Sequence, residues 1–183
     1  MIYDTLSKGE DGLYHTKALN DDKKRHFTQL NGVKVVDVDD ETGEISFEIL
    51  GDDNQAKVES VHVTNLQSAM ENSKSWFGKE LTEKTITGAY TRGETLPADR
   101  ISATRVFDNA KELVEFNTIT PGAVCTIILE FSGLWFAKKA FGPSWNIVQV
   151  KIHEEEKIPE PEPEPEPEEE TYPDQYIIQD ETE

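Results

Sequence analysis

The sequence predicts a mainly β domain with a short helical insertion and an extended acidic C-terminal tail. Three observations carry this prediction. Apolar and polar residues alternate over 33–50, a nearly continuous β-favouring run occupies 123–131, and proline alternates with glutamate from Pro159 to Glu168. Alternation of period two is typical of a half-buried strand, whereas a Pro-Glu repeat cannot enter a packed core. The length of 183 residues suits one domain plus extensions.

Charged residues are distributed unevenly along the chain. Residues 154–183 hold 14 Asp/Glu and one Lys, whereas residues 1–153 hold 17 Lys/Arg and 23 Asp/Glu. We therefore predict a β domain over 1–153, a Pro-Glu polyproline II spacer over 154–171 and an acidic-aromatic motif over 172–183. The spacer should rise about 3.1 Å per residue. Four apolar side chains in the motif are predicted to bind a partner: Tyr172, Tyr176, Ile177 and Ile178.

The first 60 residues contain one clear hairpin. Residues 1–31 show weak periodicity, and the basic cluster 23–26 follows Asp21 and Asp22, which indicates a solvated surface. Residues 33–50 are predicted as two strands around the acidic turn 39–43. The carboxylates of that turn do not make an EF-hand, because Gly43 stands one place too late and strands flank the turn.

The middle of the chain changes to a helical pattern. We expect an amphipathic helix from Val61 that ends at Gly78, a second short helix or turn over 82–90, and a loop from Arg92 through Pro97 to Arg100. Trp76 and Phe77 are adjacent, so they must point to different sides of a helix. One could pack inward while the other contacts a partner.

The last third is predicted to supply the longest strands. Residues 102–107 should form a strand, 113–116 a weak helical or irregular link, and 123–131 a central strand extended to Phe136. A loop over 138–144 leads to a return strand over 145–152. The two long strands make a hairpin with an aromatic and basic tip.

No motif for catalysis, a cofactor or a metal is present. The chain has no phosphate-binding loop, His-Glu-x-x-His or nucleophile elbow, and its four histidines lack metal-ligand spacing. Cys125 lies within a predicted strand and is expected to be a buried small hydrophobe. We therefore expect a protein that is not an enzyme and needs no cofactor. A signal peptide and a membrane-spanning run are also not expected.

Two segments carry a family resemblance. Residues 71–81 (ENSKSWFGKEL) and 132–150 (SGLWFAKKAFGPSWNIVQV) resemble motifs of small proteins from large nucleocytoplasmic DNA viruses of the chlorovirus and mimivirus type. These viral proteins in turn resemble, distantly, the single-stranded DNA-binding proteins of short-tailed phages. The resemblance implies an OB-like Greek-key barrel with the 123–152 hairpin as its last part. It also implies an acidic tail that competes with DNA and recruits replication partners.

Binding of a single strand needs rings on which bases stack and cations that follow the phosphates. The predicted stacking residues are Trp135, Phe136, Phe141 and Trp145, and the predicted phosphate contacts are Lys138, Lys139, Lys151, Arg92, Arg100 and Arg105. The mildly acidic body argues against strong nonspecific binding, so these cations would have to share one face.

Other functions stay open at this point. A virion component, such as a minor capsid protein that uses the tail for assembly contacts with capsid proteins, is the main alternative. An adaptor that works only through the tail needs no nucleic acid at all. The DNA-binding function would place the protein inside the infected host, and the virion role would place it in the virion. A homodimer is compatible with either.

Overall fold

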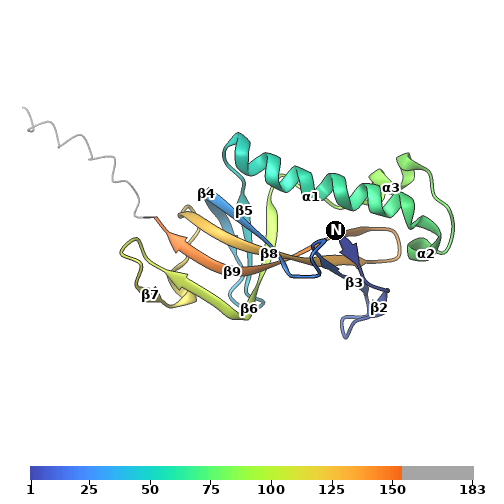
Figure 1. The fold of residues 1–183 in the computed structure, drawn as a ribbon. Coiled ribbons are helices and arrows are strands. Elements are labelled where there is room, and N and C mark those ends of the chain that lie inside the picture. The colour runs from blue at the N-terminus through green and yellow to red at the C-terminus, as the bar shows by residue number, and fades with distance from the viewer. Residues whose placement is uncertain (154–183) are drawn as a thin grey trace, which may run out of the picture.

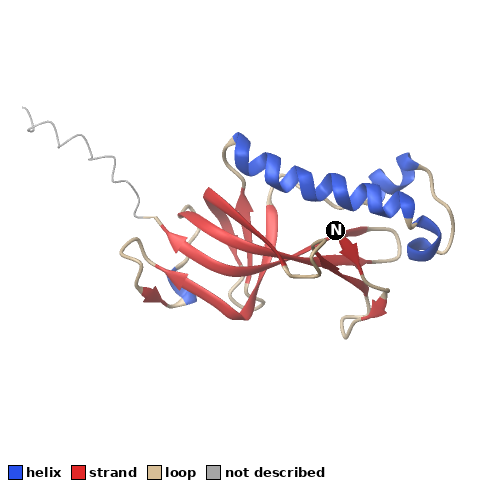
Figure 2. Cartoon of the chain, in the orientation of Figure 1, coloured by secondary structure: helices blue, strands red, loops and turns tan. Residues whose placement is uncertain are grey.

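The computed structural model describes residues 1–153, and these form a mainly β fold (Figure 2). Five of the strands pair into a closed barrel. The barrel strands are β4 (His26–Val38), β5 (Glu44–Glu48), β6 (Leu96–Phe107), β8 (Val124–Phe136) and β9 (Phe141–Ile152). β4 pairs antiparallel with β5 and β5 with β6, whereas β6 pairs in parallel with β9. β9 pairs antiparallel with β8, which returns to β4 and closes the ring. This is an OB-like Greek-key arrangement, as predicted.

Short strands extend the barrel at both ends. β3 (Tyr14–Leu19) continues the edge of β8 beyond β4, and it carries β1 (Ile2–Tyr3) and β2 (Ser7–Lys8). β7 (Leu113–Val114) pairs with β6 at the other end and precedes a short 3₁₀ helix, η1 (Phe116–Thr118). The N-terminal strands were not predicted, because residues 1–31 show almost no alternation.

Three helices lie between β5 and β6: α1 (Asp52–Glu71), α2 (Ser73–Phe77) and α3 (Glu83–Ala89). Figure 1 shows α1 running along one side of the sheet, with α2 and α3 beside the turn between β8 and β9. Gly78 ends α2 in the left-handed conformation, with φ of 76°, as expected for a C-terminal glycine.

The prediction that the helix starts at Val61 was wrong, because α1 begins nine residues earlier, at Asp52. Its buried stripe recurs every three or four residues, but it contains polar side chains at Asn54, His62 and Asn65, which hid the pattern. Asn54 donates to Leu50 O at 2.7 Å and accepts from Asn31 N at 3.1 Å. These hydrogen bonds satisfy the buried amide of Asn54, so a polar side chain can lie on the buried face of α1.

Two predicted loops are partly strand. Residues 96–100, predicted as loop, open β6, because β5 pairs with them from Leu96 to Asp99. Residues 141–144 open β9, so the loop of the long hairpin shrinks to Ala137–Ala140, which is closed by a hydrogen bond from Ala137 N to Ala140 O. Tertiary pairing overrides the turn signals of Pro97 and Pro143.

The core fills the barrel and the space under α1. Trp145, Phe47, Phe131 and Phe141 are the largest fully buried side chains. Cys125 is fully buried, as predicted, and burial raises the pKa of its thiol to about 11.

The structure does not test the predictions for the tail, but it does describe the acidic turn. The spacer and the partner-binding residues Tyr172, Tyr176, Ile177 and Ile178 lie outside the described residues. Within residues 1–153, no helix is long and apolar enough to cross a membrane, and no three His, Cys, Asp or Glu side chains are grouped to hold a metal ion. The acidic turn is organised instead by Asp39, which accepts the backbone N–H groups of Glu41 and Thr42.

Candidate nucleic-acid interface

A large, mainly apolar concavity lies between α2, α3 and the tip of the β8–β9 hairpin, with a volume of about 810 Å³. We call it the aromatic groove. Among residues 1–153, five aromatic side chains and three lysines line it, and no Asp or Glu does. These eight residues are Tyr14, Trp76, Phe77, Phe136, Phe141, Lys79, Lys138 and Lys139.

The rings of the groove pack against one another. Phe136 and Phe141 face each other across the last pair of the hairpin and stack with their centroids 5.7 Å apart. Phe77 approaches Phe141 edge-on at 5.2 Å, and Trp76 approaches Phe136 at 5.6 Å. The two motif segments that carry the family resemblance therefore meet here, since 71–81 supplies α2 and 132–150 supplies the hairpin tip.

Exposure decides which rings could meet a ligand. Phe141 is fully buried and Phe136 is 7% exposed, so these two form the floor. Trp76 and Phe77 are half-buried, and Tyr14 is 50% exposed on the strand that pairs with Phe136. The prediction that Phe136 and Phe141 offer stacking faces to solvent is therefore wrong, and Tyr14, Trp76 and Phe77 occupy that position instead.

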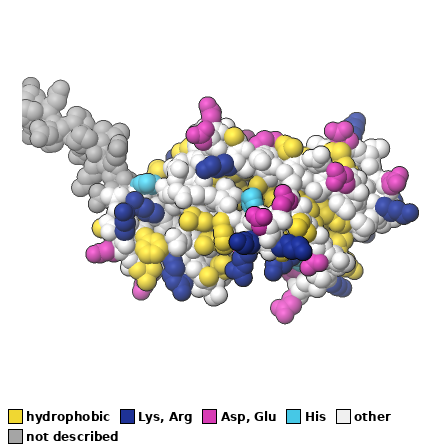
Figure 3. Space-filling model, viewed as in Figure 1, with side chains coloured by type: hydrophobic (Ala, Val, Ile, Leu, Met, Phe, Trp, Pro, Cys, Tyr) yellow, Lys and Arg dark blue, Asp and Glu magenta, His cyan; other side chains and the backbone are white. Residues whose placement is uncertain are grey.

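The lysines of the groove are exposed and, among the described residues, make no ion pair. Figure 3 shows Lys and Arg spread over the visible face with Asp and Glu among them, so the face has no single sign of charge. A groove without carboxylates is a local exception, and it can attract an anion.

Trp135 lies on the opposite side of the hairpin from Phe136, because successive side chains of a strand alternate between faces. It borders a second concavity of about 360 Å³, which we call the indole pocket. Arg92 and Trp145 line the same pocket. Trp145 is 1% exposed, so its predicted role as an open stacking face is also wrong.

A chain of buried hydrogen bonds supports the wall of the indole pocket. Tyr3 Oη donates to Asn65 Oδ1 at 2.7 Å, and Asn65 Nδ2 donates to Tyr90 Oη at 3.0 Å. Tyr90 Oη lies 2.6 Å from Nδ1 of His62, a residue that lines the pocket. Burial, with a smaller effect of Arg92, lowers the pKa of His62 to about 4, so the ring is neutral near pH 7. Arg92 itself donates two hydrogen bonds to the Glu59 carboxylate.

The remaining predicted cations lie away from the tip of the hairpin. Lys151 is opposite Thr126, ten residues from Phe136 along β8, which corresponds to about 33 Å. Arg105 is opposite Gln149 on the neighbouring strand, and Arg100 lies 4.5 Å from the centroid of the Phe116 ring. The ten predicted residues therefore do not line one common cleft.

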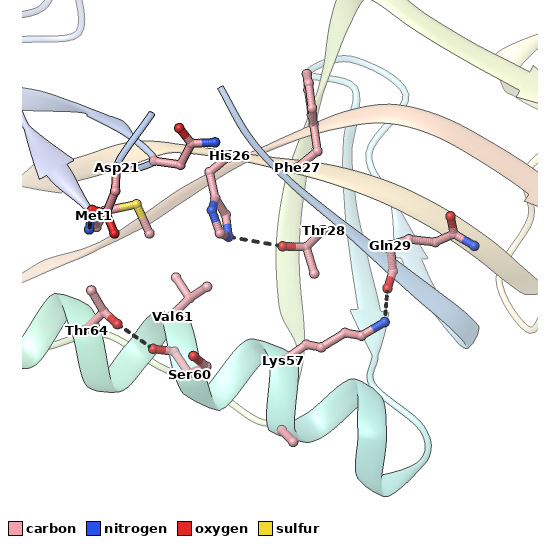
Figure 4. Close-up of a pocket in the computed structure, with 12 residues that line it drawn as sticks. Met1, Asp21, His26, Phe27, Thr28, Gln29, Lys57, Ser60, Val61 and Thr64 are labelled. Carbon is pink, nitrogen blue, oxygen red and sulfur yellow. Dashed lines mark hydrogen bonds and ion pairs between the residues drawn. The ribbon is translucent and has the colours of Figure 1, made fainter. Parts of the chain in front are cut away.

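A third concavity, of about 710 Å³, separates α1 from β4 (Figure 4). Several of its polar groups already have partners within the described residues. Lys57 Nζ donates to Gln29 O at 2.8 Å, Thr28 Oγ1 lies 3.3 Å from His26 Nε2, and the amino group of Met1 pairs with Asp21 at 2.6 Å. Because these contacts are internal, this groove is a weaker candidate for a ligand.

Tyr14 and Lys79 were not predicted as site residues. For Trp76 and Phe77, the sequence left open whether each ring packs in the core or contacts a partner. Tyr14 follows Gly12 and Leu13 in a stretch without periodicity, and only its pairing with Phe136 brings it to the groove. The Trp76-Phe77 pair followed by Lys79 was the available signal, since an aromatic pair next to a cation repeats the composition of the hairpin tip.

Comparisons with known proteins give one family and one distant structure. The single-stranded DNA-binding protein from bacteriophage Enc34, solved in complex with ssDNA, aligns with a TM-score of 0.44 and 11% identity, over 81% of this chain and 93% of that chain. No curated protein matches the sequence. A family model matches residues 31–180, a range that contains both the α2 segment and the whole β8–β9 hairpin. The chain therefore belongs to the family of unknown function DUF5871.

Proposed function

We propose that this protein binds single-stranded DNA without catalysis and that the strand lies in the aromatic groove. The observation that carries the proposal is the composition of that groove, in which residues 1–153 supply aromatic rings and three lysines but no carboxylate. Bases stack on aromatic faces whatever their sequence, and lysines beside them neutralise phosphates. The groove thus offers both stacking faces for bases and cations for phosphates, which together give sequence-tolerant binding.

The rings supply the sequence-tolerant part of the affinity. Stacking is worth about 1–3 kcal/mol per base, and Tyr14, Trp76 and Phe77 retain exposed surface in the groove. The buried pair Phe136 and Phe141 holds these rings from below. Two stacked bases would supply about 2–6 kcal/mol, which is enough for measurable binding when the lysines add their share.

The same groove suits the acidic tail of the chain. Residues 154–183 carry 14 Asp/Glu against one Lys, and the motif at their end contains Tyr172 and Tyr176. The ten-residue Pro-Glu repeat spans about 31 Å if it is fully extended. We propose that this tail competes with DNA for the groove and, when displaced, recruits replication partners of a large DNA virus inside the infected host.

The test is fluorescence anisotropy of labelled oligo-dT, first with the full chain and then with a 1–153 truncation. We expect salt-sensitive binding by both proteins and tighter binding by the truncation, because the competing anion is gone. Equal affinity of the two proteins would contradict the proposed competition by the tail but would still support DNA binding.

A different result would remove the function itself. If neither protein binds oligo-dT at low salt, the groove does not hold DNA. The virion role would then be tested by mass spectrometry of purified particles, in which a capsid component must occur at fixed stoichiometry.

A further inference from the structure

The indole pocket contains a hydrogen-bond donor that the protein leaves unused. Trp145 lines the pocket and is 1% exposed, and its Nε1–H has no acceptor among the described residues. Buried donors without an acceptor are rare, because each costs about 1–3 kcal/mol. An unpaired donor beside a cavity points to a ligand that brings the acceptor.

His62 supplies a second hydrogen-bond donor to the indole pocket. Tyr90 Oη accepts from Asn65 Nδ2, so its single proton is free to donate to His62 Nδ1, 2.6 Å away. The neutral imidazole then carries its own proton on Nε2. His62 lines the indole pocket and is 8% exposed, so this N–H is a second nearly buried donor at the same cavity.

The lining of the same pocket also includes an acceptor and a stacking face. Glu44, at the start of β5, contributes a carboxylate to the pocket lining. The indole of Trp135 is half-exposed there and covers Gly142, where an added Cβ would come within 2.9 Å of the ring. The absence of a side chain at this position lets the ring lie against the strand.

We propose that the indole pocket is a nucleobase subsite that favours thymine or uracil, an inference that rests on the proposed DNA-binding function. Two donors and one carboxylate complement the two carbonyl oxygens and the ring N–H of these bases. Adenine presents an amino group instead of a carbonyl and would leave a donor unpaired. A volume of about 360 Å³ accommodates one base stacked on Trp135.

The direct test is the indole N–H signal of Trp145 in the ¹⁵N-labelled full chain, titrated with oligo-dT and with oligo-dA of equal length. The chain has three tryptophans, so Trp76→Phe and Trp135→Phe assign the third signal by elimination. We expect saturating oligo-dT to shift the Trp145 signal downfield and oligo-dA to leave it in place. This measurement does not depend on whether a Trp145 variant folds.

The second test is the ratio of affinities for oligo-dT and oligo-dA in Trp145→Phe. Removing one neutral hydrogen bond should lower that ratio about 2- to 12-fold. Stacking within the oligonucleotides is the same for both proteins, so the change in the ratio reports the protein's contribution. The matched control is Trp76→Phe in the aromatic groove, which should weaken both strands equally and leave the ratio unchanged.

The outcomes separate the two proposals. An unmoved Trp145 signal while anisotropy reports bound oligo-dT would overturn the subsite and leave DNA binding intact. A Trp145→Phe ratio equal to that of the wild type would do the same. If neither oligonucleotide binds, the function and the subsite that rests on it fail together.

Discussion

Replacing Lys138 and Lys139 together with alanine removes two of the three cations that line the aromatic groove. Both side chains are exposed at the tip of the hairpin and make no ion pair within residues 1–153. The double substitution should therefore leave the fold unchanged while it weakens contacts with phosphates. This separates binding from stability.

The magnitude follows from counterion release. Each phosphate neutralised on a single strand contributes about −0.7 to the slope of log affinity against log salt. Three lysines predict a slope of about −2.1, and the variant should retain about −0.7. A fourfold rise in salt then weakens the wild type about 18-fold and the variant about 2.6-fold.

The assay is anisotropy of labelled oligo-dT across a salt series. The matched control is Lys24→Ala with Lys34→Ala, an equal loss of charge at exposed positions that do not line the groove. The control should keep the wild-type slope. If the control loses as much slope as the groove variant, binding follows net charge and the groove has no special role.

Three further predictions concern stacking, pH and backbone packing. Tyr14→Leu should weaken oligo-dT binding by about 1–3 kcal/mol with little change in melting temperature, because it removes the stacking ring but keeps an apolar side chain on this half-buried position. A large loss of stability instead would mean that Tyr14 is structural. The pKa of His62 is about 4 in the folded chain and about 6.5 when unfolded. The unfolded state therefore takes up its proton first, and the contribution of His62 to stability is lost as pH falls from about 6.5 toward 4. Urea titrations should show that this residue accounts for about 2 kcal/mol of the loss between pH 7 and pH 5, and that His62→Gln removes that share. Gly133→Ala should lower the free energy of unfolding by about 3 kcal/mol or more. The reason is that φ at Gly133 is 149° and an added Cβ would overlap the carbonyl oxygen of Thr16. A smaller loss in urea unfolding would mean that β3 can move away from β8.

Several elements were predictable because their signal is local. Strong alternation placed the strands around residues 33–50, and β-branched runs placed the centre of β8. Gly78 marked the end of α2 because only a residue without a side chain adopts a positive φ at little cost. The start of α1 was missed because Asn54, His62 and Asn65 interrupt its apolar stripe, and their hydrogen-bond partners lie far away in sequence.

The candidate site shows the same division. Composition alone located an aromatic and basic hairpin tip and an acidic tail, since both are runs of adjacent residues. Which rings are open was decided by packing, which buries Phe141 and Trp145 and leaves Tyr14 exposed. Alternation along β8 turns Trp135 and Phe136 to opposite faces, so one sequence cluster became two sites. The chain by itself determined the kinds of side chain available, whereas closure of the barrel determined their neighbours, because strand pairing joins residues that no local pattern connects.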